Sequence, residues 1–336
     1  MPELRQDPTT KQWVVIATER AKRPEDYSKN LDKVELPHYS ENCPFCPGNE
    51  AMTPPEELAY RCEGTEPDTE GWWVRVIPNK FAALVPNGGL GRMHESGFFR
   101  SMEGVGKHEV VIESPLHNAT VGTMDLRQIE EILLIYRDRF NELSQDPRFQ
   151  FVTIFRNHGK LAGTSLHHPH SQLIATPIVP LHIRHRLEEA MRYYDDHGEC
   201  VFCRMLDEEL NVQKRVVLET EKFLAFVPFA SSTPFETWIM PKEHAATYGN
   251  ISIDDAKKLA EVLSRIMKKL HSGLNDPDYN YMIYTAPFKD ANGNWYHWFI
   301  RIAPRLNMIA GFELGSRVFI NTTPPEVAAE FLRQEI

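Results

Sequence analysis

Two stretches of the chain carry apolar residues at helical spacing. Residues 125–143 and 254–273 each place an apolar side chain every three or four positions, and each stretch opens on an aspartate. The apolar positions are Leu126, Ile129, Ile132, Leu133, Tyr136 and Phe140 in the first stretch, and Ala256, Leu259, Val262, Leu263, Ile266 and Leu270 in the second. This spacing predicts two amphipathic helices that each bury one face.

The segments around both helices are rich in β-branched and aromatic residues in partial alternation, which is typical of strands. They also occur in the same order in the two halves of the chain. The matched segments are 81–86 with 223–228, 108–117 with 235–244, 149–157 with 279–287, and 168–177 with 297–305. His117 precedes His168 by 51 residues, and His244 precedes His297 by 53. The pattern predicts two copies of one α+β unit.

The duplication predicts the domain organisation. We expect an α+β fold of two tandem domains, each with an antiparallel sheet and flanking helices, at 1–177 and 200–336. A basic, charged, helix-like connector is expected at 178–199. The glycine-rich stretch 87–106 has no counterpart in the second copy, so we expect a mobile loop near a site.

Composition excludes some classes of protein. The chain has 336 residues, 42% of them hydrophobic and 25% charged, and a net charge of -10. These values are typical of a soluble globular protein, and the negative charge argues against nonspecific nucleic-acid binding. No signal peptide and no apolar run of the ~18 residues that a membrane span needs is present. We therefore expect a cytoplasmic protein with no membrane partner.

Cysteine and histidine recur as matched sets in the two copies. In a reducing compartment, a Cys-x-x-Cys pair is more often a metal site or a redox pair than a disulfide. Two thiolates and two imidazoles suit a tetrahedral Zn²⁺ that leaves no open position, so we expect structural zinc. The predicted first site is Cys43, Cys46, His117 and His168, and the predicted second site is Cys200, Cys203, His244 and His297. The alternative for the second set is ordinary core or surface histidines beside remnant thiols.

The stretch 163-GTSLHHPHSQ-172 carries the candidate chemistry. In a strand, His168, His170 and Gln172 point to one face. If His168 binds zinc, His170 lies beside a rigid anchor, and a neutral imidazole is a good nucleophile for phosphorus. Gln172 can donate a hydrogen bond to a phosphoryl oxygen but cannot deliver a proton, which favours a transferase whose leaving group is a phosphate. The hydroxyl of Ser165 is placed for the same phosphate.

The second copy serves as an internal comparison. It keeps His297 but has Trp298 and Phe299 where the first copy has Pro169 and His170. A phenylalanine cannot attack phosphorus, so we expect one active centre per chain, in the first half. The alternative for the histidine stretch itself is a metal-binding strand without chemistry.

The run 157-NHGKLAGTSLHHPHSQ-172 resembles the histidine-triad superfamily, and in particular its transferase branch, the galactose-1-phosphate uridylyltransferases. The resemblance extends over nearly the whole chain and includes 43-CPFC-46, 79-NKFAAL-84, 234-PFETWIMPKEH-244 and 310-AGFE-313. It implies two tandem histidine-triad-like domains. It also implies an enzyme of galactose metabolism that moves UMP from UDP-glucose to galactose 1-phosphate by ping-pong chemistry through His170.

The resemblance also implies contacts for the nucleotide sugar and the hexose 1-phosphate. Gln172 and Ser165 would hold the transferred phosphoryl group, and the partners would be those two substrates within a homodimer whose active sites are shared. The other implied substrate-binding residues are Arg20, Arg23, Asn79, Phe81, Asn157, Phe312 and Glu313. Two alternatives remain open, an ADP-glucose phosphorylase of the same fold and a non-catalytic zinc and nucleotide-binding module.

Overall fold

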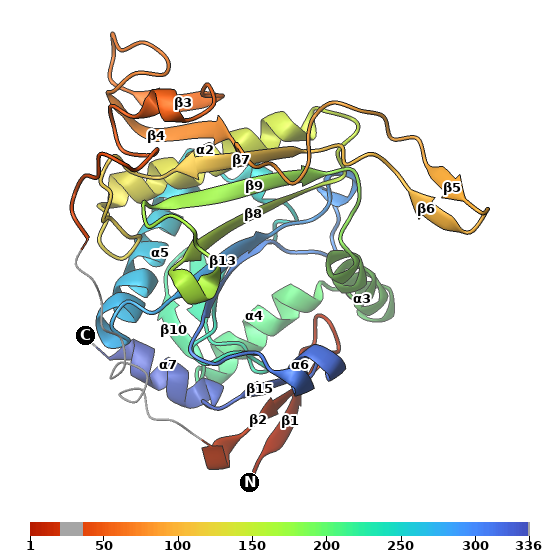
Figure 1. Ribbon diagram of the computed structural model, residues 1–336. Helices are drawn as coiled ribbons and strands as arrows, with labels where there is room; N and C mark the ends of the chain where they lie inside the picture. The colour runs from red at the N-terminus through yellow and green to blue at the C-terminus, as the bar shows by residue number, and fades with distance from the viewer. Residues whose placement is uncertain (21–35, 335–336) are drawn as a thin grey trace.

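The computed structural model describes residues 1–20 and 36–334 (Figure 1). Its centre is a ten-stranded antiparallel sheet in the order β10-β11-β12-β14-β13-β8-β9-β7-β4-β3. The first half of the sheet contains β3 (Leu58–Arg61), β4 (Trp72–Pro78), β7 (Lys107–Ile112), β8 (Phe151–His158) and β9 (His170–Thr176). The second half contains β10 (Val216–Glu219), β11 (Phe223–Phe226), β12 (Thr237–Pro241), β13 (Tyr279–Tyr284) and β14 (Phe299–Pro304). The predicted α+β class with antiparallel sheets is confirmed.

The two halves have the same strand order and meet at β8 and β13. These strands pair antiparallel, with Asn157 opposite Asn280, so the two half-sheets are continuous. Pairing registers locate the equivalent positions in the two halves. Val110 of β7 lies opposite Gln172 of β9, as Trp238 of β12 lies opposite Arg301 of β14.

These registers correct two details of the sequence alignment. Residue 108 corresponds to 236, one position beyond the predicted match with 235. Residues 81–86 were matched with 223–228, but they form a loop after β4, with one isolated bridge from Val85 to Val105. The strand equivalent to β11 is β4, since β4 pairs with β7 as β11 pairs with β12. The likeness of the letters FAALVP and FLAFVP was misleading.

The two predicted amphipathic helices cover one face of the sheet. They are α2 (Leu126–Ser144) and α5 (Ile253–Gly273), and their apolar stripes share one core with the strands (Figure 1). Asp125 caps α2 by accepting a hydrogen bond from the Gln128 amide at 2.8 Å. In α5 the cap is Ser252, one residue before the helix and ahead of the predicted aspartate start.

The opposite face is covered by different segments in the two halves. The predicted connector contains α3 (Leu181–His197), which packs with α4 (Val201–Val212) over the second half. Over the first half lies the Cys43–Cys46 segment, whose apolar side chains contact β4 and β7. This face carries the candidate catalytic and metal-ligating residues.

The ends of the described chain lie beside the second half. The strand β2 (Trp13–Ile16) pairs with β1 (Glu3–Gln6) on one side and with β15 (Phe319–Asn321) on the other, close to α6 (Gly311–Ser316) and α7 (Pro325–Arg333) (Figure 1). The short 3-10 turns are η1 (Thr18–Arg20), η2 (Glu50–Met52), η3 (Lys160–Ala162), η4 (Tyr248–Asn250) and η5 (Phe288–Asp290). Within the described ranges, no helix has the length and apolar character needed to cross a membrane.

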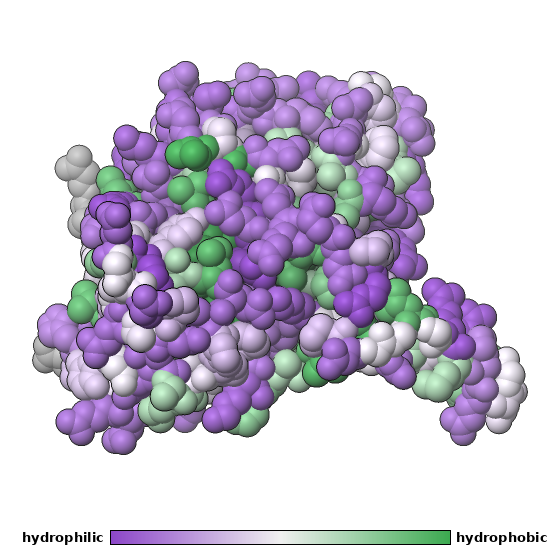
Figure 2. All heavy atoms as spheres, turned by 90° about the horizontal axis from the view of Figure 1, so that it is seen from above, coloured by the Kyte–Doolittle hydropathy of each residue, from purple (hydrophilic) through white to green (hydrophobic). Residues whose placement is uncertain are grey.

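The glycine-rich stretch 87–106 forms an arm. It contains the hairpin of β5 (Met93–Glu95) and β6 (Phe99–Ser101), which stands out from the body of the molecule (Figures 1 and 2). Phe98 and Phe99 lie edge to face near its tip and are 78% and 61% exposed. The arm thus exposes apolar surface away from the core.

Candidate active site and metal centres

His168 connects the first metal set to the catalytic strand. Its ring is fully buried, and its Nε2 lies 2.7 Å from the carbonyl oxygen of Ser114. Donation from Nε2 to this carbonyl leaves the Nδ1 lone pair for a metal. That Nδ1 lies 3.6 Å from Sγ of Cys46. The residue therefore has the orientation expected of a zinc ligand.

The first predicted metal set converges in space. The ligand atoms of Cys43, Cys46, His117 and His168 all lie within 4.8 Å of one another. The Cys46 Sγ lies 3.5 Å from Nδ1 of His117, close to the ~3.6 Å that tetrahedral Zn–S and Zn–N bonds imply. Burial lowers the pKa of His168 to about 3, so its ring is neutral, as a ligand requires. The donor set fits Zn²⁺.

The second set is partly assembled. Cys200 precedes α4, Cys203 lies in its first turn, and their thiols lie with His244 in a group within 4.8 Å. His297 is not in this group, although its ring centroid lies 5.4 Å from that of His244. The buried Nε2 of His297 has no hydrogen-bond partner among the described residues. An orphaned imidazole nitrogen on a ring next to His244 also fits a metal.

One ring nitrogen of His170 forms a hydrogen bond with the protein, and the other has no such bond within the described residues and could react. The Nδ1–H donates to the backbone carbonyl of His168 at 2.8 Å, which leaves the lone pair on Nε2. Burial lowers the pKa of His170 from its ordinary value of 6.5, so the ring is neutral at neutral pH. His168 therefore has two contacts: its ring belongs to the first metal set, and its backbone carbonyl orients the candidate nucleophile His170.

Gln172 lies two residues along the same strand face and is oriented by His108, a residue that the sequence interpretation missed. The Ala83 amide donates to Nδ1 of His108, so Nε2 carries the proton and donates to Oε1 of Gln172 at 2.7 Å. This bond leaves the amide NH₂ of Gln172 as a donor for a phosphoryl oxygen. The signal was present in the first residue of 108-HEVVIESPLH-117, but only the strand pairing reveals its partner.

The predicted base and ribose contacts lie beside this group. Nδ2 of Asn79 lies 3.1 Å from Nε2 of His108, and Oδ1 of Asn79 accepts from the Phe81 amide at 2.8 Å. The Phe81 ring is 86% exposed. The structure therefore places Asn79 next to His108 and leaves the Phe81 ring accessible to a planar ligand.

The loop between β8 and β9 carries Ser165, and contacts with Asp278 fix its backbone. At Gly159 the φ angle is +84°, and an added Cβ would lie 1.9 Å from a carboxylate oxygen of Asp278. The same carboxylate accepts from the Leu161 amide at 2.6 Å. Only glycine fits this close approach. The loop then reaches Ser165, which is exposed and lies five residues before His170.

Asn157 connects the catalytic half to the second half. Its Oδ1 accepts from Nδ2 of Asn280 at 2.7 Å, and Oδ1 of Asn280 accepts from Nε of Arg305 at 2.5 Å. This arrangement leaves the Asn157 NH₂ group as the donor. A polar chain therefore crosses the β8–β13 seam on the catalytic face.

A buried polar network lies on the opposite face of β9. Nε of Arg156 lies 2.8 Å from Oε2 of Glu113, and both side chains are almost fully buried. The Tyr136 hydroxyl lies 2.9 Å from Oε1 of Glu113 and 2.7 Å from Oγ of Ser171. Because Ser171 separates His170 from Gln172, this network fixes the backbone between the two catalytic candidates.

Four predicted contacts are not brought together with His170 in the part of the chain that the structure describes. Phe312 and Glu313 lie in α6, and Glu313 lines a cavity over the second half of the sheet. Arg20 ends η1, and Arg23 lies outside the described residues. Their substrate-binding roles stay predictions.

Comparisons with known proteins agree with the site. The family models "Galactose-1-phosphate uridyl transferase, N-terminal domain" and "C-terminal domain" match residues 1–180 and 186–334. An ADP-glucose phosphorylase of Arabidopsis thaliana is 37% identical over 99% of this chain and 93% of its own. A galactose-1-phosphate uridylyltransferase of Thermotoga maritima is 32% identical over 99% of this chain and 98% of its own.

Solved structures give the same grouping. The crystal structure of the Arabidopsis thaliana ADP-glucose phosphorylase with bound ADP-glucose has a TM-score of 0.83 and 34% identity, covering 100% of this chain and 99% of its own. A uridylyltransferase structure has a TM-score of 0.76 and 27% identity, covering 99% and 97%. Fold and site thus define a nucleotidyl-transferring enzyme. The chain belongs to the galactose-1-phosphate uridylyltransferase family.

Proposed function

We propose that the chain transfers a nucleoside monophosphate from a nucleoside-diphosphate sugar through a covalent intermediate on His170. The observation that carries the proposal is the committed Nδ1–H of His170, which leaves a neutral Nε2 beside the Gln172 amide. A fixed nucleophile with a phosphoryl-oxygen donor on the same strand face suits phosphoryl transfer.

The first step is an exchange of one bond for another. Nε2 of His170 attacks the α-phosphorus, an N–P bond forms, and the bond from that phosphorus to the bridging oxygen breaks. The sugar 1-phosphate leaves as a phosphate anion, so no acid is needed to protonate it. The NH₂ groups of Gln172 and Asn157 are the donors proposed for the phosphoryl oxygens, with the Ser165 hydroxyl and the arginines Arg20 and Arg23 as further contacts. An acceptor phosphate then attacks phosphorus and releases the imidazole.

For the donor we propose ADP-glucose, with inorganic phosphate as the acceptor. The support is the higher identity to the Arabidopsis relative, 37% against 32% for the Thermotoga relative. The products would be glucose 1-phosphate and ADP. The second candidate is the UDP-glucose and galactose 1-phosphate exchange predicted from the sequence, which the Phe312-Glu313 pair favours as a hexose contact.

Zinc is proposed at both Cys-His sets as a structural ion. Cys43, Cys46, His117 and His168 would hold one ion, and Cys200, Cys203 and His244 would hold the other together with His297. When bound, zinc supplies a cross-link between the Cys-x-x-Cys turn and the sheet. In the first set that cross-link fixes the strand that carries His170.

We also propose a homodimer in which Phe312 and Glu313 serve the partner's active site. The support is their position in α6, where Glu313 lines the cavity over the second half of the sheet and does not lie with His170 of the same chain. Mixing the inactive variants His170→Ala and Glu313→Gln tests this directly. Recovery of activity on mixing supports shared sites, and no recovery after proven subunit exchange contradicts them.

The test of the function is intact-protein mass spectrometry after mixing with ADP-glucose, or with UDP-glucose, in the absence of acceptor. The expected result is a gain of one AMP, lost in His170→Ala and retained in His167→Ala. His167 is an exposed histidine in the same stretch, so it is a matched control. A gain of UMP alone moves the assignment to the uridylyltransferase. No adduct from either donor overturns the covalent mechanism.

A further inference from the structure

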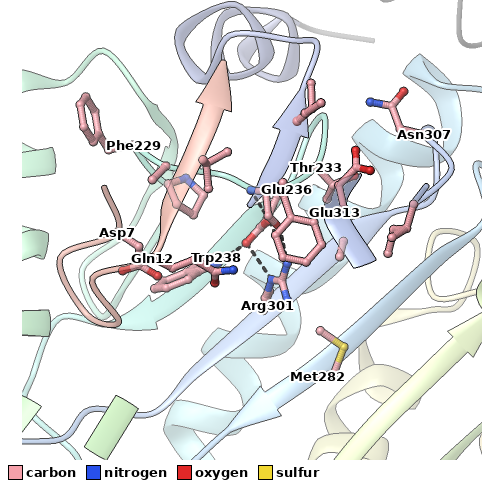
Figure 3. Close-up of a pocket in the computed structure, with 18 of the residues that line it drawn as sticks. Asp7, Gln12, Phe229, Thr233, Glu236, Trp238, Met282, Arg301, Asn307 and Glu313 are labelled. Atoms are coloured by element: carbon pink, nitrogen blue, oxygen red, sulfur yellow. Dashed lines mark hydrogen bonds and ion pairs between the residues drawn. The ribbon is translucent and has the colours of Figure 1, made fainter. Parts of the chain in front are cut away.

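A cavity of about 290 Å³ lies over the second half of the sheet, on the same face as the catalytic residues (Figure 3). Its walls come from the β1–β2 hairpin, β12, β14, α3 and the segment that leads into α6. The volume is near the lower end of small-molecule sites, which begin at ~300 Å³. It suits a compact ligand better than a whole nucleotide sugar.

The cavity lies over strand positions that correspond to Gln172 and His108 in the first half. Arg301 is the equivalent of Gln172, and Glu236 is the equivalent of His108, by the strand registers. Phe299 stands in place of His170 and is stacked between Trp238, at a centroid distance of 4.1 Å, and Tyr284, at 4.8 Å. No nucleophile therefore stands at the position equivalent to His170, and the cavity is lined instead by the neighbouring residues Trp238, Arg301 and Glu236.

Arg186 of α3 lies over this aromatic stack and lines the cavity. Its guanidinium carbon lies 5.1–5.4 Å from the ring centroids of Trp238, Tyr284 and Phe299, which is cation–π range. Its buried Nη1 has no hydrogen-bond partner among the described residues. Its carboxylate neighbour Asp7 is loosely placed, at 3.9 Å from Nη2. A buried donor without an acceptor is unfavourable, so an anionic ligand would relieve it.

Two further arginines line the same cavity. Arg301 is neutralised by Glu236, which it contacts at 2.7 and 3.0 Å, as the dashed lines in Figure 3 show. Arg305 uses Nε for Asn280 and has no such carboxylate partner among the described ion pairs. Burial lowers the pKa of Arg305, and the charge of Arg301 lowers it further. The positive charge also acts on His182, whose pKa is lowered first by burial and then by the charges of Arg186 and Arg301.

The cavity also offers a carboxylate acceptor, Asp7. One oxygen of Asp7 accepts from the amide and hydroxyl of Thr9. The other oxygen lies 3.9 Å from Nη2 of Arg186 and has room for a ligand hydroxyl. Figure 3 shows Asp7 and Glu313 on different walls, with Arg301 and Glu236 between them. Cationic and hydroxyl-binding groups thus face one small space.

We propose that this cavity is a second ligand site, which binds a small phosphate monoester that carries hydroxyl groups, of the size of a hexose phosphate. Arg186 and Arg305 bind the phosphate, and the carboxylate of Asp7 accepts from a hydroxyl. Arg301 stays paired with Glu236 and forms the floor. The site binds and releases its ligand unchanged, since Phe299 stands where a nucleophile would be. The proposal goes beyond the proposed function and does not depend on which nucleotide is transferred.

The test is equilibrium dialysis of labelled glucose 1-phosphate against the full-length protein. Wild type is expected to bind one more equivalent per chain than Arg186→Met, which keeps a side chain on the aromatic stack but removes the donors. Arg192→Met is the matched control, because Arg192 lies in the same helix with a 68% exposed side chain. It should bind as wild type does. Equal stoichiometry and affinity in wild type and Arg186→Met would overturn the proposal.

Further measurements separate the alternatives. Thermal unfolding and formation of the His170 adduct should be unchanged in Arg186→Met. If the variant is unfolded, Arg305→Gln replaces it in the binding measurement alone, because Arg305 also contacts Asn280 and through it Asn157. Inorganic phosphate and glucose alone should each bind at least tenfold more weakly at the Arg186-dependent site. Phosphate binding as tightly as the ester would overturn the sugar part of the proposal. Failure of adduct formation in wild type, with the extra equivalent retained, would count against the proposed function alone.

Discussion

His108 Nε2 lies 2.7 Å from Oε1 of Gln172, and Glu236 and Arg301 occupy the same two positions in the other half of the sheet. One pair is a neutral hydrogen bond that presents an amide donor to the catalytic face. The other is an ion pair that closes the floor of a cavity. A single strand register thus supports two different local chemistries in the two halves.

The neutral pair predicts a positioning role for His108. His108→Phe removes the donor that orients Gln172, so kcat for nucleotidyl transfer should fall about 10- to 100-fold with little change in KM. His108→Gln, which can still donate, should recover part of the loss. Rapid-quench measurement of the His170 adduct provides the rate.

The matched control for this experiment is His94→Phe, an exposed histidine in β5 of the arm. It should react at the wild-type rate. Equal rates in His108→Phe and wild type would show that Gln172 does not need this contact. Metal content should be the same in all these variants, because His108 is outside both Cys-His sets.

The two Cys-His sets predict metal content. Cys43→Ala should lower bound zinc by one equivalent per chain, and Cys200→Ala should do the same for the second set, as measured by elemental mass spectrometry. Both should lower the melting temperature, because the ion cross-links segments that are far apart in sequence. The exposed Cys62 is the control, and Cys62→Ala should keep all the metal. Full occupancy in Cys43→Ala would refute the first site.

The buried ion pair of Glu113 and Arg156 predicts a large stability effect. Glu113→Gln leaves the Arg156 charge uncompensated, which should lower the free energy of unfolding by about 3–5 kcal/mol. Glu208→Gln in the exposed pair with Arg204 should change it by less than about 1 kcal/mol. Urea unfolding of both variants gives the comparison. Similar values for the two would mean that Arg156 finds another partner.

Glu236 predicts a pH dependence of stability. Burial alone would raise its pKa, but the charge and hydrogen bonds of Arg301 outweigh burial and hold the pKa below the ordinary 4.5. The ionised carboxylate therefore stabilises the folded state above pH 4.5, and this contribution is lost as the pH falls from there through the folded-state pKa. Glu236→Gln should lack that part of the acid-induced loss.

The measurement for Glu236 is the free energy of unfolding at a series of pH values on either side of 4.5. Glu243→Gln, at an 84% exposed side chain, is the control and should follow wild type. A constant difference between Glu236→Gln and wild type at every pH would contradict the assigned shift.

Local patterns were sufficient to predict much of the fold and part of the site. The apolar stripes gave α2 and α5, and the two-residue period placed His168, His170 and Gln172 on one strand face. The first metal set was found because its four residues are chemically distinctive. These features depend on short-range periodicity and on residue type, both of which can be read from letters.

What the sequence did not reveal depends on pairing between distant strands. The contact of His108 with Gln172 joins residues 64 positions apart, and nothing local to either one names the other. The one-residue offset between the halves arises because the connection after β7 is not the same length as the connection after β12. The likeness of 81–86 to 223–228 was a similarity of letters between a loop and a strand.

The seam between β8 and β13 explains why a half without a nucleophile persists in the chain. β13 supplies the hydrogen-bonding partner for the inner edge of the catalytic half-sheet, and Asn280 reaches across it to Asn157. The innermost strand of the second half is therefore constrained by the catalytic half as well as by its own core. The second half thus supports the fold of the catalytic half. A chain without β13 would leave the edge of β8 unpaired, and we expect that the catalytic half would not fold stably.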